Sequence, residues 1–183
     1  MKIKKLKLPG PCFIEPKIFH DKRGFLYESW NKFEYLKKKL KINIVQVINT
    51  HSKKNVLRGL HIQYPNLQGK LISVLNGKIF DVIVDVRKNS PTFGKSCKVI
   101  IDSKKKKMLW IPEGFAHGYL VLTKYADVVY YCTCKYYPKN QNEIIWNEPF
   151  FNIKWPIKKP ILSKKDSEGL KINQIKNLPK WKK

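Results

Sequence analysis

Short strand-forming segments follow one another between residues 70 and 146, with turn residues between them and no helical pattern of apolar positions. A run of strands at this spacing, without helices between them, predicts an antiparallel β-sandwich or barrel and an all-β fold. The dipeptide Asn76-Gly77 separates the first two strands, and it is a strong short-range signal for a tight hairpin. The segments are KLISVL, KIFDVIVDVR, CKVII, KMLWI, GYLVL, DVVYYCT and EIIW.

Residues 78–87 show the strand period most clearly. Phe80, Val82, Val84 and Val86 share one predicted face, and Asp81, Ile83, Asp85 and Arg87 share the other. Near the amino terminus a single helix is predicted, with Asn31 as its cap, Glu34 three residues later, and an apolar stripe of Phe33, Leu36 and Leu40. The tail from Trp155 onward predicts loops and a short helix. At 183 residues, the chain predicts one domain spanning 1–183.

The charge of the chain is strongly positive, with 38 lysine and arginine residues against 13 aspartate and glutamate residues, a net charge of +25. Such a field attracts anionic substrates and polyanions. The basic residues are mostly lysines spread along the chain, and no helix-turn-helix, zinc-finger or RNA-binding consensus accompanies them. Nucleic-acid binding is therefore the weaker alternative, and we expect no nucleic-acid partner.

The cysteines and the apolar segments indicate the compartment. The four cysteines form no Cys-x-x-Cys pair, and Pro9-Gly10-Pro11 interrupts the basic amino terminus before any signal-peptide core. No segment approaches the roughly 20 apolar residues of a membrane span. The sequence predicts a reduced, cytoplasmic protein without a membrane partner.

The segment NVLRGLHIQY combines buried-strand aliphatics with polar side chains. In a regular strand Arg58 and His61 would point to opposite faces, because side chains alternate. Gly59 between them allows a β-bulge that re-aims one of the two. We therefore expect both side chains to line the mouth of a pocket, whereas a lone histidine would more often be a hydrogen-bonded core residue.

His117 lies in PEGFAHG, a turn followed by a histidine that enters a strand. This pattern is half of the metal-binding signature of cupin barrels. The other half requires two histidines and a nearby glutamate, but His61-Ile62-Gln63 supplies one histidine only. Two histidines are too few for a catalytic metal site. We predict no metal and no cofactor, with a metal-dependent cupin enzyme as the alternative.

The segments VLRGLH, QGKL, GKIFDVIVDVR, SPTFGK, LWIPEGFAHGYLVL and WP occur in this order. Together they resemble the nucleotide-linked 4-keto-6-deoxysugar 3,5-epimerases, typified by dTDP-4-dehydrorhamnose 3,5-epimerase. The resemblance extends over a core of about residues 9–166. It implies a cupin jelly-roll and a homodimer in which an amino-terminal strand of each subunit closes its partner's pocket.

The resemblance also implies an enolate mechanism and the residues that carry it. His61 would be the base, since imidazole has an unperturbed pKa of about 6.5. Asp166 would hold its ring, and Lys70 would stabilise the enolate oxygen. The acid that returns the proton would be Tyr130, although the neighbouring Tyr131 could take this place if the register slips by one.

Further positions match substrate contacts of the family. Arginine suits phosphate oxygens because its guanidinium donates in a fixed fork. Tyr136 would stack on the base, His117 would lie near the sugar, and Glu28 would contact the nucleotide from the swapped strand. The remaining substrate-binding residues implied by the resemblance are Arg23, Gln46, Arg58 and Lys165.

One departure concerns the nucleotide. The family commonly reads Gln-Asp-Asn ahead of VLRGLH, whereas this chain reads Gln46-Val47-Ile48. An aliphatic side chain thus replaces a polar one that is expected to meet the nucleotide or sugar. The sequence leaves open dTDP or GDP, a hexose or a heptose, and inversion at C3 alone or at both C3 and C5. The final surface polysaccharide is equally open.

Overall fold

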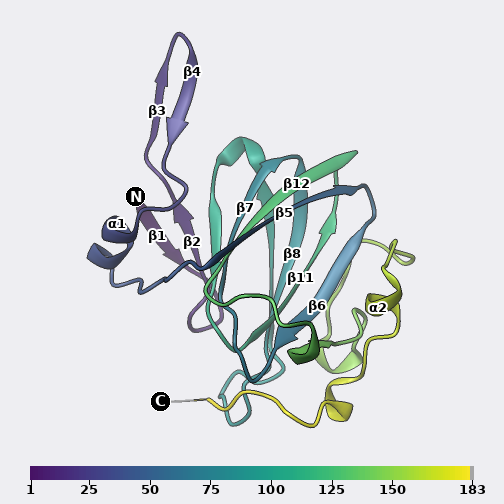
Figure 1. Cartoon of the computed structure of the whole chain (residues 1–183). Coiled ribbons are helices and arrows are strands. Elements are labelled where there is room, and N and C mark those ends of the chain that lie inside the picture. The colour runs from purple at the N-terminus through teal and green to yellow at the C-terminus, as the bar shows by residue number, and fades with distance from the viewer. Residues whose placement is uncertain (182–183) are drawn as a thin grey trace.

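The computed structural model describes residues 1–181, and β-strands account for most of its regular structure. Two sheets face each other, and a separate two-stranded hairpin extends away from them (Figure 1). The first sheet has the order β1-β2-β10-β7-β12-β5, and the second has the order β13-β6-β11-β8-β9. None of the helices in the described part of the chain is long and apolar enough to cross a membrane.

The elements have the following bounds. The strands of the first sheet are β1 (Lys2–Lys5), β2 (Cys12–Glu15), β5 (Gln46–Lys53), β7 (Lys70–Asn76), β10 (Met108–Ile111) and β12 (Tyr125–Cys132). Those of the second sheet are β6 (Leu57–Gln63), β8 (Lys78–Asp85), β9 (Ser96–Asp102), β11 (Phe115–Val121) and β13 (Gln141–Glu143). The hairpin is β3 (Ile18–Asp21) and β4 (Gly24–Tyr27), and the helices are α1 (Lys32–Lys37) and α2 (Lys164–Ser167). The 3₁₀ turns are η1 (Ser103–Lys105), η2 (Pro138–Asn140), η3 (Pro149–Phe151) and η4 (Ile172–Gln174).

The chain passes back and forth between the two sheets, which is the jelly-roll arrangement. From β9 onward, consecutive strands fall in alternate sheets: β9 in the second, β10 in the first, β11 in the second and β12 in the first. The predicted all-β jelly-roll, with a short amino-terminal helix and a loop-and-helix tail, is confirmed. The barrel is not closed, because within residues 1–181 no strand pair joins the two sheets, and the fold is a sandwich.

The prediction of a tight hairpin at Asn76-Gly77 is wrong. β7 and β8 flank this turn but do not pair, since β7 lies between β10 and β12 while β8 lies between β11 and β9. The turn therefore carries the chain from one sheet to the other. Gly77 has φ +79°, and a Cβ there would lie 2.2 Å from the Tyr125 carbonyl oxygen, so the dipeptide supplies a sharp turn without selecting the strand pairing.

The helix prediction is half right. Asn31 caps α1, because its side-chain oxygen accepts from the backbone N–H groups of Phe33 and Glu34. The apolar stripe is wrong, since Phe33 is 73% exposed and Leu36 is also exposed. Tyr35 is the buried residue, and its hydroxyl donates to the Ser29 carbonyl. A six-residue helix is too short for a continuous stripe, and packing on the sheet selects a different face.

Three apolar clusters explain why most strands carry aliphatic residues on both faces. One cluster lies between the sheets and includes Ile72, Ile83 and Tyr119. A second covers the outer face of the second sheet, where Val82 and Val84 meet the carboxyl-terminal tail. A third covers the outer face of the first sheet beneath the amino-terminal segment. The alternation predicted over residues 78–87 is confirmed, and each face meets its own cluster. The last predicted strand, EIIW, lies mainly beyond β13.

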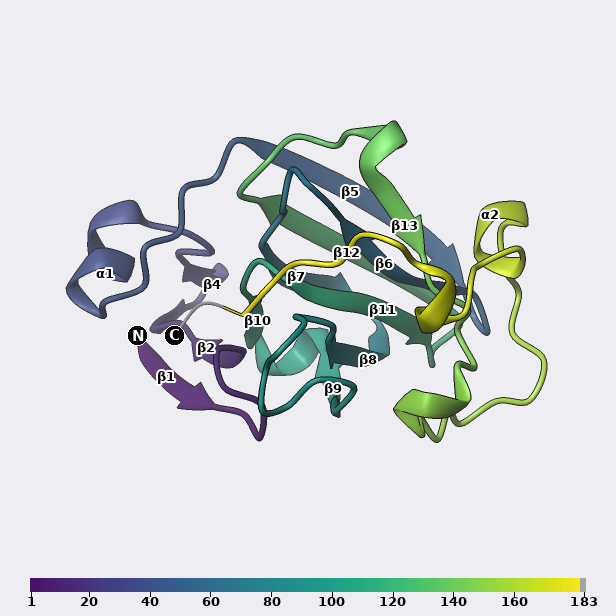
Figure 2. The same cartoon turned by 90° about the horizontal axis from the view of Figure 1, so that it is seen from below.

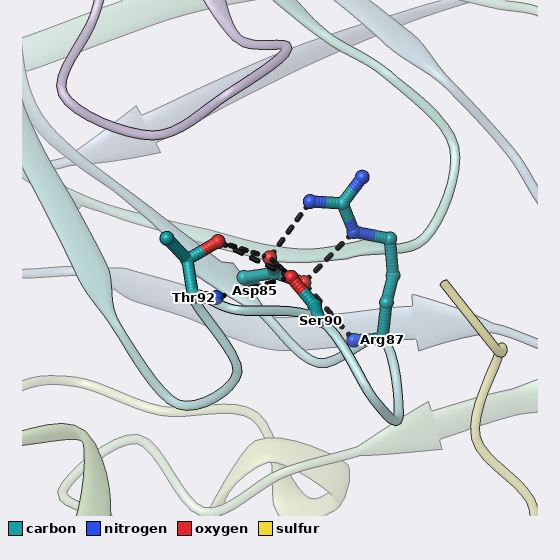
Figure 3. A network of polar contacts seen from close by, with 4 residues as sticks. All are labelled: Asp85, Arg87, Ser90 and Thr92. Atoms are coloured by element: carbon teal, nitrogen blue, oxygen red, sulfur yellow. Dashed lines mark hydrogen bonds and ion pairs between the residues drawn. The ribbon is translucent and has the colours of Figure 1, made fainter. Parts of the chain in front are cut away.

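A buried polar network ties the end of β8 to the loop that follows it (Figure 3). The Asp85 carboxylate accepts from the Arg87 guanidinium at 2.8 and 2.7 Å and from the hydroxyls of Ser90 and Thr92 at 2.6 Å each. The guanidinium lies over the rings of Phe115 and Trp181. Burial acts to raise the pKa of Asp85, but these hydrogen bonds outweigh it and lower the pKa below the usual value. The network thus anchors the end of the tail to the sandwich.

We expect Asp85→Asn to lower the free energy of unfolding by about 3 kcal/mol at neutral pH, because it leaves the partly buried Arg87 without its counter-ion. Urea denaturation measures the change, and Asp21→Asn, which breaks the exposed Asp21–Arg23 pair, is the control and should change little. Since folding lowers the Asp85 pKa, its stabilisation is complete above the unfolded-state pKa of about 3.9. It is lost as the pH falls through the lower folded-state pKa. An unchanged urea midpoint for Asp85→Asn would contradict this account.

Candidate active site

A cavity of about 340 Å³ lies between the two sheets. Strands β5, β7 and β12 supply one wall, β6 and β11 supply the facing wall, and the loop after β12 closes one side. Most of the residues predicted for the site line it. The lining residues are Ile48, Thr50, Arg58, His61, Gln68, Lys70, His117, Tyr130, Cys132, Tyr136 and Gln141.

The predicted irregularity at Gly59 is present and brings Arg58 and His61 to the same cavity. The pairing of β6 with β11 changes register between His117 and Tyr119, opposite this glycine. Gly59 has φ +115°, and a Cβ there would lie 2.6 Å from both the Gly118 Cα and the His117 carbonyl oxygen. Glycine is therefore required by both backbone conformation and space. The alternation of side chains is broken, and both polar residues face inward.

His61 forms a short hydrogen bond with a carboxylate from the tail. Its Nε2 lies 2.5 Å from Oδ1 of Asp166, which α2 holds beside β6. Asp166 is 4% exposed and also accepts from the Gly59 N–H and the Ser163 hydroxyl. The imidazole side chain is 29% exposed toward the cavity. A buried carboxylate thus orients a ring that remains accessible.

The protonation state of Asp166 decides which nitrogen of the His61 ring can act as a base. Burial acts to raise the Asp166 pKa, but hydrogen bonding and charge from His61, with help from Ser163 and Gly59, lower it below the usual value. Asp166 is therefore ionised at neutral pH and accepts the proton of His61 Nε2. In neutral imidazole only one nitrogen carries a proton, so Nδ1 is left as the basic nitrogen.

A second imidazole–carboxylate pair lies deeper in the sandwich. Nε2 of His117 on β11 is 2.8 Å from Oδ2 of Asp81 on β8, and both side chains are buried. Oδ1 of Asp81 has no hydrogen-bond partner among residues 1–181. Sequence reasoning assigned no role to Asp81. The sequence feature that could have identified Asp81 is its position as an acidic residue on the strand face that lies between the sheets.

Lys70 and Tyr130 enter the cavity from the first sheet, facing the histidines of the second. Burial lowers the pKa of the Lys70 ammonium, while the nearby Cys132 and Asp81 act in the opposite direction. Burial, with the neighbouring Tyr119, raises the pKa of Tyr130 well above its usual value. The Tyr130 phenol therefore stays protonated at neutral pH. Its ring meets that of His117 edge to face, with centroids 6.1 Å apart.

The register question between the two adjacent tyrosines is decided by the sheet. Tyr130 lines the cavity and packs against the cluster between the sheets. Tyr131 packs instead against the cluster on the outer face of the first sheet. Because neighbouring side chains of a strand point to opposite faces, only Tyr130 reaches the cavity.

The other predicted residues have different locations. Tyr136 lines the cavity, and Gln46 lies behind it, with its Oε1 accepting from the Tyr136 N–H at 2.7 Å. Lys165 is exposed on α2 and does not line the cavity. Arg23 lies in the turn of the β3–β4 hairpin, which extends away from the sandwich (Figure 1), and Glu28 directly follows β4. Arg23 pairs with Asp21, and Glu28 accepts from Asn31.

Several cavity residues were not predicted, namely Thr50, Gln68, Cys132 and Gln141. Thr50 follows Ile48 at strand spacing on β5, so alternation from Ile48 could have identified it. Gln68 belongs to the QGKL segment beside Lys70. Ile48, the aliphatic departure from the family pattern, lines the cavity, whereas Val47 is exposed on the other face.

A larger cavity of about 430 Å³ lies outside the sandwich, where η3, η4 and the tail meet. Its acidic residue, Glu148, accepts from the backbone N–H groups of Phe150 and Ile172 and so has a structural role. None of the predicted residues lines it. Across residues 1–181, no cluster of three or more histidine, cysteine, aspartate or glutamate side chains is arranged to hold a metal ion.

The comparisons with known proteins all indicate the same family. The family model for dTDP-4-dehydrorhamnose 3,5-epimerase matches residues 5–174. The dTDP-4-dehydrorhamnose 3,5-epimerase of Salmonella typhimurium is 45% identical over 174 residues, which cover 93% of this chain and 94% of that protein.

Solved structures agree in fold. A dTDP-6-deoxy-D-glucose-3,5-epimerase from Legionella pneumophila, in complex with dTDP-4-keto-L-rhamnose, superposes with a TM-score of 0.95 at 42% identity and covers 100% of this chain and 99% of its own. A 3'-monoepimerase from Streptomyces bikiniensis, in complex with dTDP-quinovose, gives a TM-score of 0.89 at 29% identity, covering 97% of this chain and 92% of its own. The sequence match over most of the chain and the shared fold lead to one conclusion: the chain belongs to the dTDP-4-dehydrorhamnose 3,5-epimerase family.

Proposed function

We propose that this enzyme inverts C3 and C5 of a dTDP-linked 4-keto-6-deoxyhexose. The observation that carries the proposal is that a carboxylate-held imidazole and a buried phenol reach one cavity from opposite sheets. Inversion needs a base on one face of the sugar and an acid on the other. The names of the relatives support dTDP as the nucleotide and both carbons as the centres.

The reaction begins with proton removal. The C4 ketone acidifies the hydrogens on C3 and C5, and Nδ1 of His61 takes one of them. The electron pair of the broken C–H bond forms the enolate, whose negative charge lies on the C4 oxygen. Asp166 stabilises the imidazolium by charge and keeps its ring in place without taking the proton. The Lys70 ammonium stabilises the enolate oxygen from the cavity wall, and the His117 ring lies near the sugar.

Tyr130 completes the inversion. Its phenol gives a proton to the carbon from the face opposite His61, and the electron pair returns from the enolate to form the new C–H bond and restore the ketone. The phenolate that remains takes a proton from solvent, and the imidazolium loses one to solvent. The protonated phenol suits this role because it donates only to a base as strong as an enolate.

The rest of the cavity serves the nucleotide. Arg58 binds the diphosphate, and Tyr136 stacks on the base with Gln46 behind it. Lys165, exposed on α2 beside Asp166, contributes positive charge. Arg58 is held by a hydrogen bond from its Nε to the Ser52 hydroxyl at 3.1 Å, which aims the guanidinium fork.

The test of this function is deuterium incorporation. The protein is incubated in deuterated water with dTDP-linked and, separately, GDP-linked 4-keto-6-deoxy sugars, and the labelled carbons are read by NMR. We expect label at C3 and C5 of the dTDP sugar. Label at C3 alone would indicate a monoepimerase, and label only in a GDP sugar would show that the nucleotide is GDP and contradict the proposal.

Arg23 and Glu28 act in the pocket of a partner subunit, which makes the enzyme a homodimer with a swapped amino-terminal segment. In support, the hairpin exposes Phe19, Phe25 and Leu26, each more than half exposed, and within residues 1–181 it pairs with no other strand. Apolar side chains at this exposure indicate a surface that a partner covers.

Complementation tests the swap. Arg23→Ala combined with Glu28→Ala is expected to lose most activity, and His61→Asn to lose all of it. Mixing the two variants by unfolding and refolding together should restore activity, because the mixed dimer contains one pocket with His61 and an intact hairpin from its partner. Activity no higher than the sum of the separate variants would contradict the swap.

A further inference from the structure

The loop of residues 134–137 follows β12 and leads toward β13 (Figure 2). Tyr136 from this loop lines the cavity. This loop is neither helix nor strand, and its backbone groups cannot rely on a ladder of hydrogen bonds. The Tyr137 carbonyl accepts from the Asn140 N–H, and side chains from elsewhere in the chain bond to four other backbone groups of the loop. All of these side chains belong to glutamines.

Gln63 is the central one. It stands at the end of β6 and is only 4% exposed. Its Nε2 donates to the carbonyls of Lys135 at 3.0 Å and Asn66 at 2.5 Å, and its Oε1 accepts from the Tyr137 N–H at 2.7 Å. Both amide protons and the carbonyl of this side chain are therefore used, and two of the three bonds hold the residues on either side of Tyr136.

Two further glutamines complete the set. Gln46, at the start of β5, accepts from the Tyr136 N–H, and Gln68, in the loop between β6 and β7, donates to the Cys134 carbonyl at 2.6 Å. The backbone of every residue from 134 to 137 is thus bound by a glutamine side chain. We call Gln46, Gln63 and Gln68 the glutamine clamp.

We propose that the glutamine clamp positions Tyr136 before the nucleotide arrives, with Gln63 as a positioning residue for nucleotide affinity. This inference rests on the proposed stacking of Tyr136 on the base. Gln63 itself does not line the cavity, so it acts through the loop. A loop already held in its bound conformation does not have to be ordered on binding, and this saving appears as affinity.

The main test is Gln63→Met, which keeps the length of the side chain and removes all three hydrogen bonds. We expect the Kd for dTDP, measured by calorimetry, and the KM to rise about tenfold, within the range for loss of an aromatic–base stack. We expect kcat to stay within about twofold, because His61 and Tyr130 are untouched. Gln63→Glu should weaken binding similarly, since its carboxylate can still accept from Tyr137 but faces two carbonyls without donating.

The control is Gln174→Met. Gln174 is an exposed glutamine whose Oε1 accepts from the Lys171 N–H outside the cavity. This variant also loses a side-chain-to-backbone hydrogen bond, and it should leave Kd, KM and kcat unchanged. If Gln63→Met lowers the melting temperature but leaves Kd and KM unchanged, the clamp is merely structural and the proposal is wrong.

Tyr136→Ala separates this inference from the proposed function. If Tyr136→Ala binds dTDP normally, the proposed base contact is wrong. If Tyr136→Ala weakens binding but Gln63→Met does not, the base contact stands and the clamp proposal fails. With both correct, adding Gln63→Met to Tyr136→Ala should weaken binding no further, because the two changes remove the same contact.

One measurement needs no variant, so it holds even if Gln63→Met does not fold. In the free wild-type enzyme, the amide protons of Tyr136 and Tyr137 should exchange slowly with deuterated water, and dTDP should add little protection. Exchange at the rate of an unstructured chain until dTDP is added would overturn the proposal, since the loop would then be ordered by the ligand.

Discussion

His61→Asn is expected to abolish deuterium uptake at both C3 and C5 while leaving the affinity for dTDP largely intact. Loss of a general base costs about 10²- to 10⁴-fold, and we expect the upper end because Asp166 orients the His61 ring for this role. Asparagine keeps a polar side chain of similar size but cannot take a proton. The measurements are NMR of the sugar in deuterated water and calorimetry with dTDP.

A matched control exists in the chain. His51 also pairs with a carboxylate, at 2.6 Å from Asp127, but this pair is exposed on the surface rather than in the cavity. His51→Asn should retain full activity. An active His61→Asn protein would remove the core of the mechanism.

Asp166→Asn should reduce activity without abolishing it, because the carboxylate orients the ring and takes no proton. The asparagine amide could donate to His61 Nε2 and so favour the tautomer whose Nδ1 carries the proton, which leaves no base toward the cavity. We expect a loss of about 10²-fold or more in kcat with KM nearly unchanged. Wild-type rates in Asp166→Asn would show that the short 2.5 Å contact is structural.

Tyr130→Phe is the second large effect. The histidine can still remove a proton and return a solvent-derived one to the same face. We therefore expect deuterium exchange at one or more carbons next to the ketone to continue, while inverted product falls by about 10²-fold or more. Exchange without inversion is a distinctive outcome, and NMR of the recovered sugar separates it from simple inactivation.

Tyr131→Phe is the natural control, because Tyr131 is adjacent in sequence but packs on the outer face of the first sheet. Both exchange and inversion should stay near wild-type levels. If Tyr131→Phe fails and Tyr130→Phe works normally, the acid is Tyr131 and the inward face of β12 in solution differs from the one described.

Much of the fold could be predicted because its signals are local. The alternation of residues 78–87 and the turn residues between strands follow from backbone geometry and the burial of side chains, and both were recovered. The Asn31 cap was recovered for the same reason, since a cap depends on the next three residues. The segments that resemble the family also pointed to His61, Lys70 and Tyr130, and these three residues line one cavity.

The incorrect predictions concern features that long-range packing determines. Asn76-Gly77 is a genuine turn, but the choice between pairing β7 with β8 and placing them in facing sheets depends on β10, β11 and β12. The exposed face of α1 likewise depends on which side the sheet covers. Neither choice is visible in a window of ten residues.

The sequence alone determined most of the strands from residue 55 onward, the alternation of residues 78–87 and the chemical residue types of the site, because each depends on residues close together in the chain. Strands β1 to β5 were not predicted. Only the tertiary structure decided which groups meet. The family resemblance had implied that Asp166 holds His61, 105 positions away, and the two are in contact. The contact of Asp81 with His117 and the convergence of Gln46, Gln63 and Gln68 on one loop are seen in the tertiary structure alone. The physical reason is that hydrogen bonds between distant segments form only when the packing of the apolar core has brought their strands together, and that packing is a property of the whole chain.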